Sequence, residues 1–469
     1  MTRSLVAGVD SSTQSCKVVV CDADTGAVVR TGRSPHPDGT QVHPEAWWSA
    51  WEHATSGGLL DGVEALAVGG QQHGMVTLDP HGEIVRPALL WNDTRSAESA
   101  DDLVREFGGP GAWAQEIGVV PVAAITVTKL RWLARQEPES LARTRTCVLP
   151  HDWLTGKILQ AQGGFEGWTT DRGDASGTGY WSAHTQRYRD DVLELATGRA
   201  LEVPRVLAPR ESAGRTTSGM VVAAGTGDNM GAALGLGLAP GDVVVSLGTS
   251  GTVFARHGQA VSDASGALAS FADAEGGYLP LLCTLNASRV LNAGAALLGV
   301  DFAGLDALAL AADPGAGGLI LLPYLDGERT PNLPLATGSL VGLTRTNATP
   351  ENLARAVVEG MLLNLVAGVD ALRAAGVEIH RILVIGGAAI SPAVQQIAPL
   401  LFGVPVAIPA AGEYVGIGAA RQAAWALSGT AKPPAWSTSI DAQFAPGPAD
   451  QAADIVQRYR QAVHALHGR

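Results

Sequence analysis

The chain has 469 residues, of which 46% are hydrophobic and 16% are charged, and its formal net charge at pH 7 is −13. This length predicts at least two large domains, and the composition is typical of a well-packed protein. The negative charge argues against nucleic acid and anionic lipid as partners. We expect no signal peptide and no membrane span, and four cysteines without C-x-x-C spacing fit a reducing, cytoplasmic location.

The first half of the chain begins with three predicted strands, at residues 4–10, 16–22 and 26–33, joined by turns of small polar residues. The elements expected after them are a helix over 44–60, a buried strand over 63–70, a hairpin over 75–85, and helices over 126–138 and 151–163. The segment 164–181 is rich in Gly, Thr and Asp, so we expect a connecting or functional loop there.

The second half starts after a glycine-rich boundary near residues 237–241, which predicts domains over 1–238 and 239–469. A long helix is predicted over 349–376, because Thr349 suits its N-cap and Pro350 its first position. The elements expected after it are a strand over 381–389 entering a glycine turn, a helix over 391–403, a strand over 404–409 and a helix over 413–429. A strand, glycine turn and helix N-terminus in succession can hold an anion or a ribose.

Two segments far apart in the sequence share one pattern: a β-branched strand, a turn of small polar residues and glycine, and a second strand. They are LVAGVDSSTQSCKVVV (5–20) and VVVSLGTSGTVFA (243–255). One copy in each half suggests a duplicated α/β fold that closes on a phosphate-bearing nucleotide, since such turns offer N–H and hydroxyl donors to phosphate. No P-loop sequence occurs, and no G-x-G-x-x-G lies between an early strand and a helix.

Two aspartates are candidates for the chemistry of phosphoryl transfer. Asp228, in the sequence T-G-D-N, is our candidate for the base that takes the proton from a substrate hydroxyl, with Asn229 beside it to hold that hydroxyl. The alternative is an aspartate that only caps the following helix. Asp10 ends the first predicted strand, where its carboxylate can bind Mg²⁺ near the phosphates. An ordinary turn aspartate is the alternative for Asp10.

Two polar clusters suit a sugar. Gln72 and His73 follow the buried strand, and neutral amide and imidazole groups fit a polyol that needs several hydrogen bonds and no charge. The alternative for His73 is a hydrogen-bonded histidine of the core. Trp91 and Asp93 lie in the sequence LLWNDTRS, where the indole can stack on the C–H face of a sugar, although eleven tryptophans in the chain make a chance Trp easy to find.

Ten short motifs occur in the order and spacing found in the FGGY family of carbohydrate kinases, which the chain resembles from about residue 4 to residue 425. They are GVDSSTQSCKVVV, GQQHG, LWNDTR, GDN, SLGTSG, LPYLDGERTP, GLTRTN, RAVVEG, VIGGAA and GIGAAR. KLRWLARQEPE, VLPHDWL and TDRGDASGT are similar to segments of the members that act on D-xylulose. The resemblance implies an α/β fold with two ribonuclease-H-like domains, of the actin/hexokinase type, flanking a deep cleft.

The resemblance also implies a reaction: transfer of phosphate from ATP, with Mg²⁺, to O5 of D-xylulose. The N-terminal domain would bind the sugar and the C-terminal domain the nucleotide, and a homodimer is one assembly that the family allows. The roles carried to matching positions are the base Asp228, the metal-side acid Asp10, the sugar contacts Gln72, His73, Trp91, Asp93 and Asn229, and the nucleotide contacts Ser11, Thr13, Gly248, Thr249, Gly386, Gly387 and Ala388.

Two positions depart from the family pattern, and two alternatives stay open. Gln72 stands where many members acting on D-xylulose carry methionine, and Ala388 replaces a glycine of the adenosine loop, at a cost of about 1 kcal/mol if its φ were positive. One alternative is a kinase of the same fold for ribulose, an alditol or glycerol. The other is a sugar- or nucleotide-sensing protein of the actin/Hsp70-like fold without turnover, against which Asp228 and the Gln72–His73 pair argue.

Overall fold

The computed structural model describes residues 3–468, which form two compact units. The first unit comprises the chain up to Leu238 and two later segments, His257–Leu279 and Ala411–Thr438. The second comprises Ala239–Arg256, Pro280–Ala410 and the chain from Ser439 onward. Each unit is therefore built mainly from one half of the sequence, while two segments of the second half complete the first unit.

The first unit is organised around a mixed sheet in the order β13-β14-β5-β1-β2-β3. Its strands are β1 (Leu5–Ser11), β2 (Ser15–Asp22), β3 (Val28–Pro35), β5 (Val63–Gly70), β13 (Ser212–Arg215) and β14 (Val221–Ala223), with β15 (Thr226–Gly227) paired to β5. β1 and β2 form the antiparallel hairpin predicted from the sequence, and β5 runs parallel to β1.

The second unit repeats this pattern in the order β19-β17-β16-β22-β23-β24. Its strands are β16 (Asp242–Leu247), β17 (Gly251–Ala255), β19 (Tyr278–Thr284), β22 (Arg381–Ile385), β23 (Val406–Pro409) and β24 (Ile440–Phe444). β16 pairs antiparallel with β17 and parallel with β22, as β1 does with β2 and β5. The outer pairings match as well, so the two halves share one topology, as their two similar segments predict.

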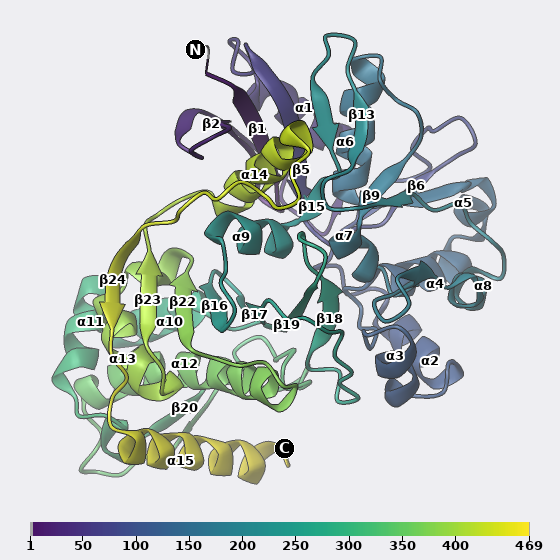
Figure 1. Ribbon diagram of the computed structural model, residues 1–469. Helices are drawn as coiled ribbons and strands as arrows, with labels where there is room; N and C mark the ends of the chain where they lie inside the picture. The colour runs from purple at the N-terminus through teal and green to yellow at the C-terminus, as the bar shows by residue number, and fades with distance from the viewer. Residues whose placement is uncertain (1–2, 469) are drawn as a thin grey trace. The chain divides into compact units, whose positions relative to one another are not determined.

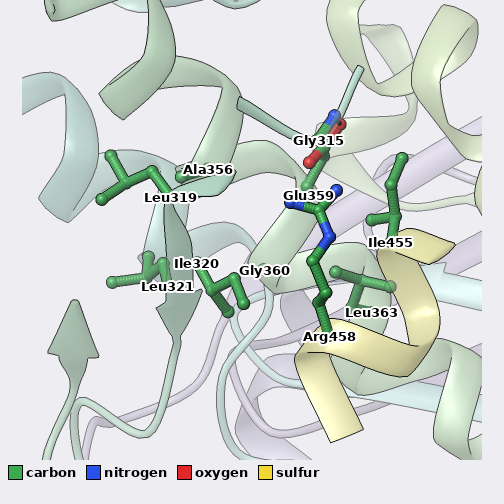
Figure 2. Close-up of a pocket in the computed structure, with 10 residues that line it drawn as sticks. All are labelled: Gly315, Leu319, Ile320, Leu321, Ala356, Glu359, Gly360, Leu363, Ile455 and Arg458. Atoms are coloured by element: carbon green, nitrogen blue, oxygen red, sulfur yellow. Dashed lines mark hydrogen bonds between the residues drawn. The ribbon is translucent and has the colours of Figure 1, made fainter. Parts of the chain in front are cut away.

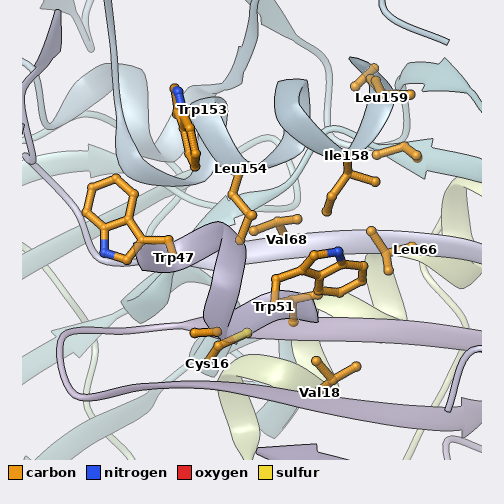
Figure 3. Close-up of a cluster of buried hydrophobic side chains, with 14 of the residues drawn as sticks. Cys16, Val18, Trp47, Trp51, Leu66, Val68, Trp153, Leu154, Ile158 and Leu159 are labelled. Atoms are coloured by element: carbon orange, nitrogen blue, oxygen red, sulfur yellow. The ribbon is translucent and has the colours of Figure 1, made fainter. Parts of the chain in front are cut away.

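Large aromatic side chains fill one face of the first sheet (Figure 3). They come from α1 (Glu45–Ala54) and α6 (Pro150–Ala161), which follow the apolar spacing of helices that cover a sheet. Trp47 and Trp153 meet edge to face with ring centroids 6.1 Å apart, and Trp51 packs in the same cluster. This core fixes the sheet whose strand ends carry the candidate site.

Small residues cover the opposite face, where α14 (Tyr414–Ser428) lies along β1 and β5 (Figure 1). A Cβ at Gly8 would lie 1.8 Å from the carbonyl oxygen of Gly416, and one at Gly418 would lie 1.9 Å from that of Gly231. Only glycine permits such approaches of backbone to backbone. The second contact joins α14 to α9 (Asp228–Leu236), so it helps to fix the position of Asp228 at the start of α9.

The long helix α12 (Pro350–Ala374) is the core helix of the second unit. Thr349 caps it by accepting a hydrogen bond from the N–H of Asn352 at 3.2 Å, as its sequence predicts. Within residues 3–468 it is long and apolar enough to cross a membrane by composition alone, but 83% of its most apolar stretch is buried inside the protein. It packs against β17, α10 (Ser288–Leu298), α11 (Phe302–Ala311) and α13 (Pro392–Phe402).

The loop predicted over 164–181 is wrong, because this segment holds β9 (Thr169–Asp171) and the short helix α7 (Arg172–Ser176). Asp171 caps α7 with its carboxylate, which accepts the N–H groups of Gly173 and Asp174. The helix predicted over 44–60 ends at Ala54, six residues early. The helix predicted over 126–138 is α4 (Thr126–Gln136).

The remaining elements escaped sequence reasoning or are very short. The helices are α2 (Ala97–Glu106), α3 (Pro110–Glu116), α5 (Pro138–Arg143), α8 (Asp190–Thr197) and α15 (Ala449–His467). The short strand pairs are β4 (Gln41–Val42) with β7 (Ala88–Leu89), β6 (Val76–Leu78) with β8 (Thr146–Val148), β9 with β12 (Arg205–Leu207), β10 (Trp181–Ser182) with β11 (Arg187–Tyr188), and β20 (Ile320–Leu322) with β21 (Ser339–Val341).

The contact between α9 and α14 yields a prediction about stability. Gly418→Ala places a methyl group 1.9 Å from a backbone oxygen, so the two helices must move apart, and we expect a loss of about 3 kcal/mol in the free energy of unfolding. Gly111→Ala in α3 is the matched control, because no atom lies within 4 Å of its added Cβ. Urea unfolding followed by tryptophan fluorescence measures both; equal midpoints for the two variants contradict the prediction.

Candidate active site

Asp228 is the first residue of α9, and Gly227 occupies the N-cap position before it. One oxygen of the Asp228 carboxylate accepts hydrogen bonds from the backbone N–H and the side-chain Nδ2 of Asn229, both at 2.8 Å. Asp228 thus accepts an N–H group of the first turn of α9, as the helix-capping alternative expects, although Gly227 holds the N-cap position itself. The carboxylate is half-buried at the positive end of the helix.

Burial, and to a smaller extent the negative charge of Asp10, raise the pKa of Asp228, while the hydrogen bonds from Asn229 lower it; the net pKa is about 7. A carboxylate with a pKa near neutrality can be deprotonated at physiological pH and still accept a proton. This is the property that a general base needs, and perturbed pKa values are typical of functional sites.

Asp10 is almost completely buried near the end of β1. One of its oxygens lies 3.5 Å from Nζ of Lys17, which is its partner in the β1–β2 hairpin and also contacts Glu413 at 2.7 Å. Burial raises the pKa of Asp10, and Lys17 opposes that shift. Its other oxygen, Oδ1, has no hydrogen-bond partner among residues 3–468. A buried carboxylate oxygen without a partner fits a hard cation such as Mg²⁺.

The turn after β1 is tied to the predicted sugar residues. Ser11 is buried, and its carbonyl accepts the N–H of Gln71 at 3.2 Å. The hydroxyl of Thr13 accepts a hydrogen bond from Nε1 of Trp91 at 2.8 Å. The structure thus joins residues predicted for phosphate, Ser11 and Thr13, to the loops predicted for the sugar.

The sugar residues at the end of β5 meet the proposed base. Asn229 donates from Nδ2 to Oε1 of Gln72 at 3.4 Å, so Asn229 contacts both Asp228 and Gln72. Within the described part of the chain, Nε2 of Gln72 and both amide atoms of Gln71 are buried without a hydrogen-bond partner. Buried polar atoms in this state call for a polar ligand or water.

His73 is held by its neighbours. Its Nδ1 donates to the carbonyl oxygen of Gly177, just past α7, at 2.7 Å, and its ring lies 5.6 Å from that of Phe271. This hydrogen bond inside the protein is what the core-histidine interpretation expects, and it also orients the imidazole. The sugar contact of His73 stays a prediction.

Asp93 organises its own loop. One oxygen accepts from the backbone N–H and Nε of Arg95, and the other accepts from the hydroxyl of Thr40 at 2.8 Å. Burial raises the pKa of Asp93, but these hydrogen bonds outweigh burial, so the net pKa is lowered. Asp93 is thus an ionised carboxylate that shapes the loop carrying Trp91, and its direct contact with sugar stays a prediction.

The other residues predicted to bind nucleotide lie in the second unit, on two turns that follow β16 and β22. The carbonyls of Gly248 and Thr249 accept the N–H groups of Ser288 and Ala287 at 2.9 and 3.3 Å. Gly386 has a φ of 91°, and a Cβ there would lie 2.7 Å from the carbonyl group of Leu247. Glycine is therefore required at position 386.

The departure at Ala388 carries no backbone strain. Gly387 and Ala388 belong to a short 3₁₀ helix over Gly387–Ile390, and Ala388 does not have a positive φ. A Cβ at Gly387 would meet open space, whereas Ala388 is buried. The cost of about 1 kcal/mol that a positive φ would impose on Ala388 does not arise.

Sequence reasoning missed a buried ion pair beneath the base. His151, at the start of α6, lies 2.5 Å through Nδ1 from an oxygen of Asp174 in α7. A Cβ added at Gly225 would lie 2.5 Å from the His151 ring, and a Cβ added at Gly227 would lie 2.9 Å from Oδ1 of Asp174. The two glycines that precede Asp228 therefore rest on this pair. Burial lowers the pKa of His151, but the carboxylates of Asp152 and Asp174 raise it, to about 10.

Sequence reasoning also gave no role to Glu328, which lies in the motif LPYLDGERTP. Its buried carboxylate accepts hydrogen bonds from the N–H of Leu285 at 2.6 Å and from the amides of Asn286 and Asn364 at 3.0 and 2.9 Å. Leu285 lies two residues before Ala287, whose N–H group binds the carbonyl of Thr249. Glu328 thereby supports the turn after β16; no local pattern in the sequence could have revealed this contact between distant residues.

Figure 2 shows a small pocket elsewhere in the second unit. Its lining includes leucine and isoleucine side chains from β20, α12 and α15, together with Glu359 and Arg458. Glu359 is already occupied by Nε of Arg355 at 2.6 Å and by the N–H of Gly315 at 2.9 Å. The residues lining this pocket include none of those predicted to bind nucleotide.

Known proteins identify the family. Models of the N-terminal and C-terminal domains of the FGGY family of carbohydrate kinases match residues 5–237 and 243–427. The xylulose kinase of Streptomyces rubiginosus is 46% identical over 440 residues, covering 91% of this chain and 88% of that one, and that of Escherichia coli is 33% identical, covering 81% of each. The crystal structure of xylulose kinase from Bifidobacterium adolescentis, at 45% identity, covers 98% of this chain and 100% of its own, with a TM-score of 0.91. This chain belongs to the FGGY family of carbohydrate kinases, as its motifs predict, and has the actin-like fold of that family.

Proposed function

We propose that this carbohydrate kinase is a xylulose kinase, which transfers the γ-phosphoryl group of ATP to O5 of D-xylulose and releases ADP. The observation that carries the reaction is Asp228, a carboxylate with a raised pKa at a helix N-terminus, joined through Asn229 to Gln72. The choice of sugar rests on the xylulose kinases at 45% and 46% identity over most of the chain.

Asp228 acts as the general base in this proposal. It accepts the proton of the sugar O5 hydroxyl as the oxygen attacks phosphorus, while the bond from phosphorus to the β,γ-bridging oxygen of ATP breaks. Asn229 holds the carboxylate through two hydrogen bonds and offers its amide to the attacking hydroxyl. Gln72, His73, Trp91 and Asp93 orient the sugar, so that positioning supplies much of the rate.

Asp10 is the residue that would hold Mg²⁺, since its buried Oδ1 lacks a partner within residues 3–468. When bound, the metal neutralises charge on the phosphoryl oxygens. Ser11 and Thr13 of the first unit, and Gly248, Thr249, Gly386, Gly387 and Ala388 of the second, contact the nucleotide in this proposal. Residues 1–238 then act mainly on the sugar and residues 239–469 mainly on ATP, in a cytoplasmic enzyme that we propose to be a homodimer.

The test is release of ADP with Mg·ATP and a panel of D-xylulose, D-ribulose, L-ribulose, xylitol, D-arabitol and glycerol. Turnover with D-xylulose at a kcat/KM well above the other members supports the proposal. Highest kcat/KM with another member would keep the reaction and reassign the substrate. Hydrolysis of ATP at full rate without any sugar would favour a nucleotide-driven switch instead.

Replacement of the base gives the sharpest effect on rate. Asp228→Asn removes the proton acceptor but keeps the size of the side chain, so we expect kcat to fall by about 10³-fold with sugar affinity retained. Steady-state kinetics and calorimetric sugar binding measure the two quantities, with Asp24→Asn at an exposed turn as the control. A normal kcat in Asp228→Asn would assign the proton transfer to another group.

The raised pKa of Asp228 predicts how activity depends on pH. The base works only when deprotonated, so kcat/KM for D-xylulose should be constant above pH 7 and fall tenfold per unit below it, because the pKa is about 7. Asp10→Asn removes a charge that raises this pKa, so the fall should move to lower pH in that variant. A wild-type profile that stays level down to about pH 5 contradicts the role of Asp228.

Asp10→Asn also tests the proposed metal ligand. An amide binds Mg²⁺ more weakly than a carboxylate, so we expect the variant to need about tenfold more free Mg²⁺ for half-maximal activity at constant ATP. The measurement is a Mg²⁺ titration of wild type and variant. Superimposable titration curves would exclude metal binding by Asp10.

A further inference from the structure

Lys129 is a lysine whose side chain is completely buried. It lies in the first turns of α4, in the core of the first unit, and it is among the largest fully buried side chains of the described residues. Lysine is almost never buried in this way, because the ammonium group loses its hydration. A buried ammonium therefore indicates that its hydrogen bonds serve a particular purpose.

The hydrogen bonds of Lys129 go to backbone carbonyls at the sugar loop and at the start of α4. Its Nζ donates to the carbonyl oxygen of Ala124 and, at 3.3 Å, to that of His73. The hydroxyl of Thr126, one turn earlier in α4, donates to the same His73 carbonyl at 3.1 Å. Two side chains of one helix thus converge on a single carbonyl of the loop that follows β5.

His73 needs this support because its backbone is strained. Its φ of 66° lies in the left-handed region, which few residues other than glycine adopt. Such a conformation is energetically unfavourable, and it persists where surrounding contacts hold it. Lys129 and Thr126 hold the carbonyl of His73, and the carbonyl of Gly177 holds its imidazole.

We propose that Lys129 is a positioning residue of the sugar site, which keeps the loop carrying Gln72 and His73 in its strained conformation through the His73 carbonyl. This inference rests on the proposed function, because it assumes that this loop receives the sugar. Gln72 in turn contacts Asn229, which holds the proposed base. Loss of the Lys129 hydrogen bonds should therefore disturb sugar binding first and nucleotide binding little.

The test compares Lys129→Met with the wild type. Methionine fills a similar space without a charge to desolvate, so the protein can stay folded while the loop loses the hydrogen bond from Lys129. We expect the KM for D-xylulose to rise at least tenfold, the KM for Mg·ATP to stay within twofold, and amide hydrogen exchange over residues 70–76 to become faster. Lys157→Met, at a partly buried lysine paired with Glu45, is the matched control and should change none of these.

Thr126→Val removes the other hydrogen bond to the His73 carbonyl. It therefore tests the proposal even if Lys129→Met does not fold. It removes one hydroxyl donor and should raise the KM for the sugar in the same direction. An unchanged sugar KM in both variants, or an equal rise of both KM values, overturns the proposal. A wild type that turns over a different sugar contradicts only the proposed substrate, and the comparison is then made with that sugar. Amide hydrogen exchange over residues 70–76 reports, without any turnover, how firmly the loop is held. An exchange rate unchanged from wild type also overturns the proposal.

Discussion

Burial of carboxylates in the first unit is the constraint on which its candidate site depends. Burial raises the pKa values of Asp10, Asp174 and Asp228. A buried carboxylate is costly unless a cation or several donors compensate it. Lys17 lies near Asp10, and His151 is hydrogen-bonded to Asp174, whereas Asp228 accepts its hydrogen bonds from the neutral groups of Asn229. The carboxylate with the weakest charge compensation is thus the one whose proposed task is to take up a proton.

Close packing of the backbone also holds these groups in place. The close backbone approaches at Gly8 and Gly418 fix α14 to the sheet and to α9, and Asp228 begins α9. Gly225 and Gly227 rest directly on the His151–Asp174 pair. Backbone packing does not change when a proton moves, so a base held in this way keeps its position in both protonation states. Such constancy is what a group that changes charge in every reaction cycle requires.

The sequence allowed prediction of features that depend on local pattern. The hairpin at β1–β2, the capped helix α12 and the glycine turn after β22 were predictable because strand alternation, capping residues and glycine act over a few residues. The helix α7 was not, because it is short and buried on all sides, so it has no apolar stripe. The pairs His151–Asp174 and Lys129–His73 join positions 23 and 56 residues apart, which no spacing rule connects.

The two units share one order of strands but differ in chemistry at the same point of the hairpin. The cross-strand pair compared is the second one from the turn of each hairpin. In the first unit it is Asp10 and Lys17, and in the second unit it is Ser246 and Thr252. Each hairpin closes with a turn of three residues, and backbone N–H groups in such turns can hold phosphate. A charged pair beside that turn suits a metal ion, whereas two hydroxyl groups suit neutral contacts. The duplication therefore explains the architecture, and divergence at this pair of positions accounts for why the proposed metal site falls to the first unit alone.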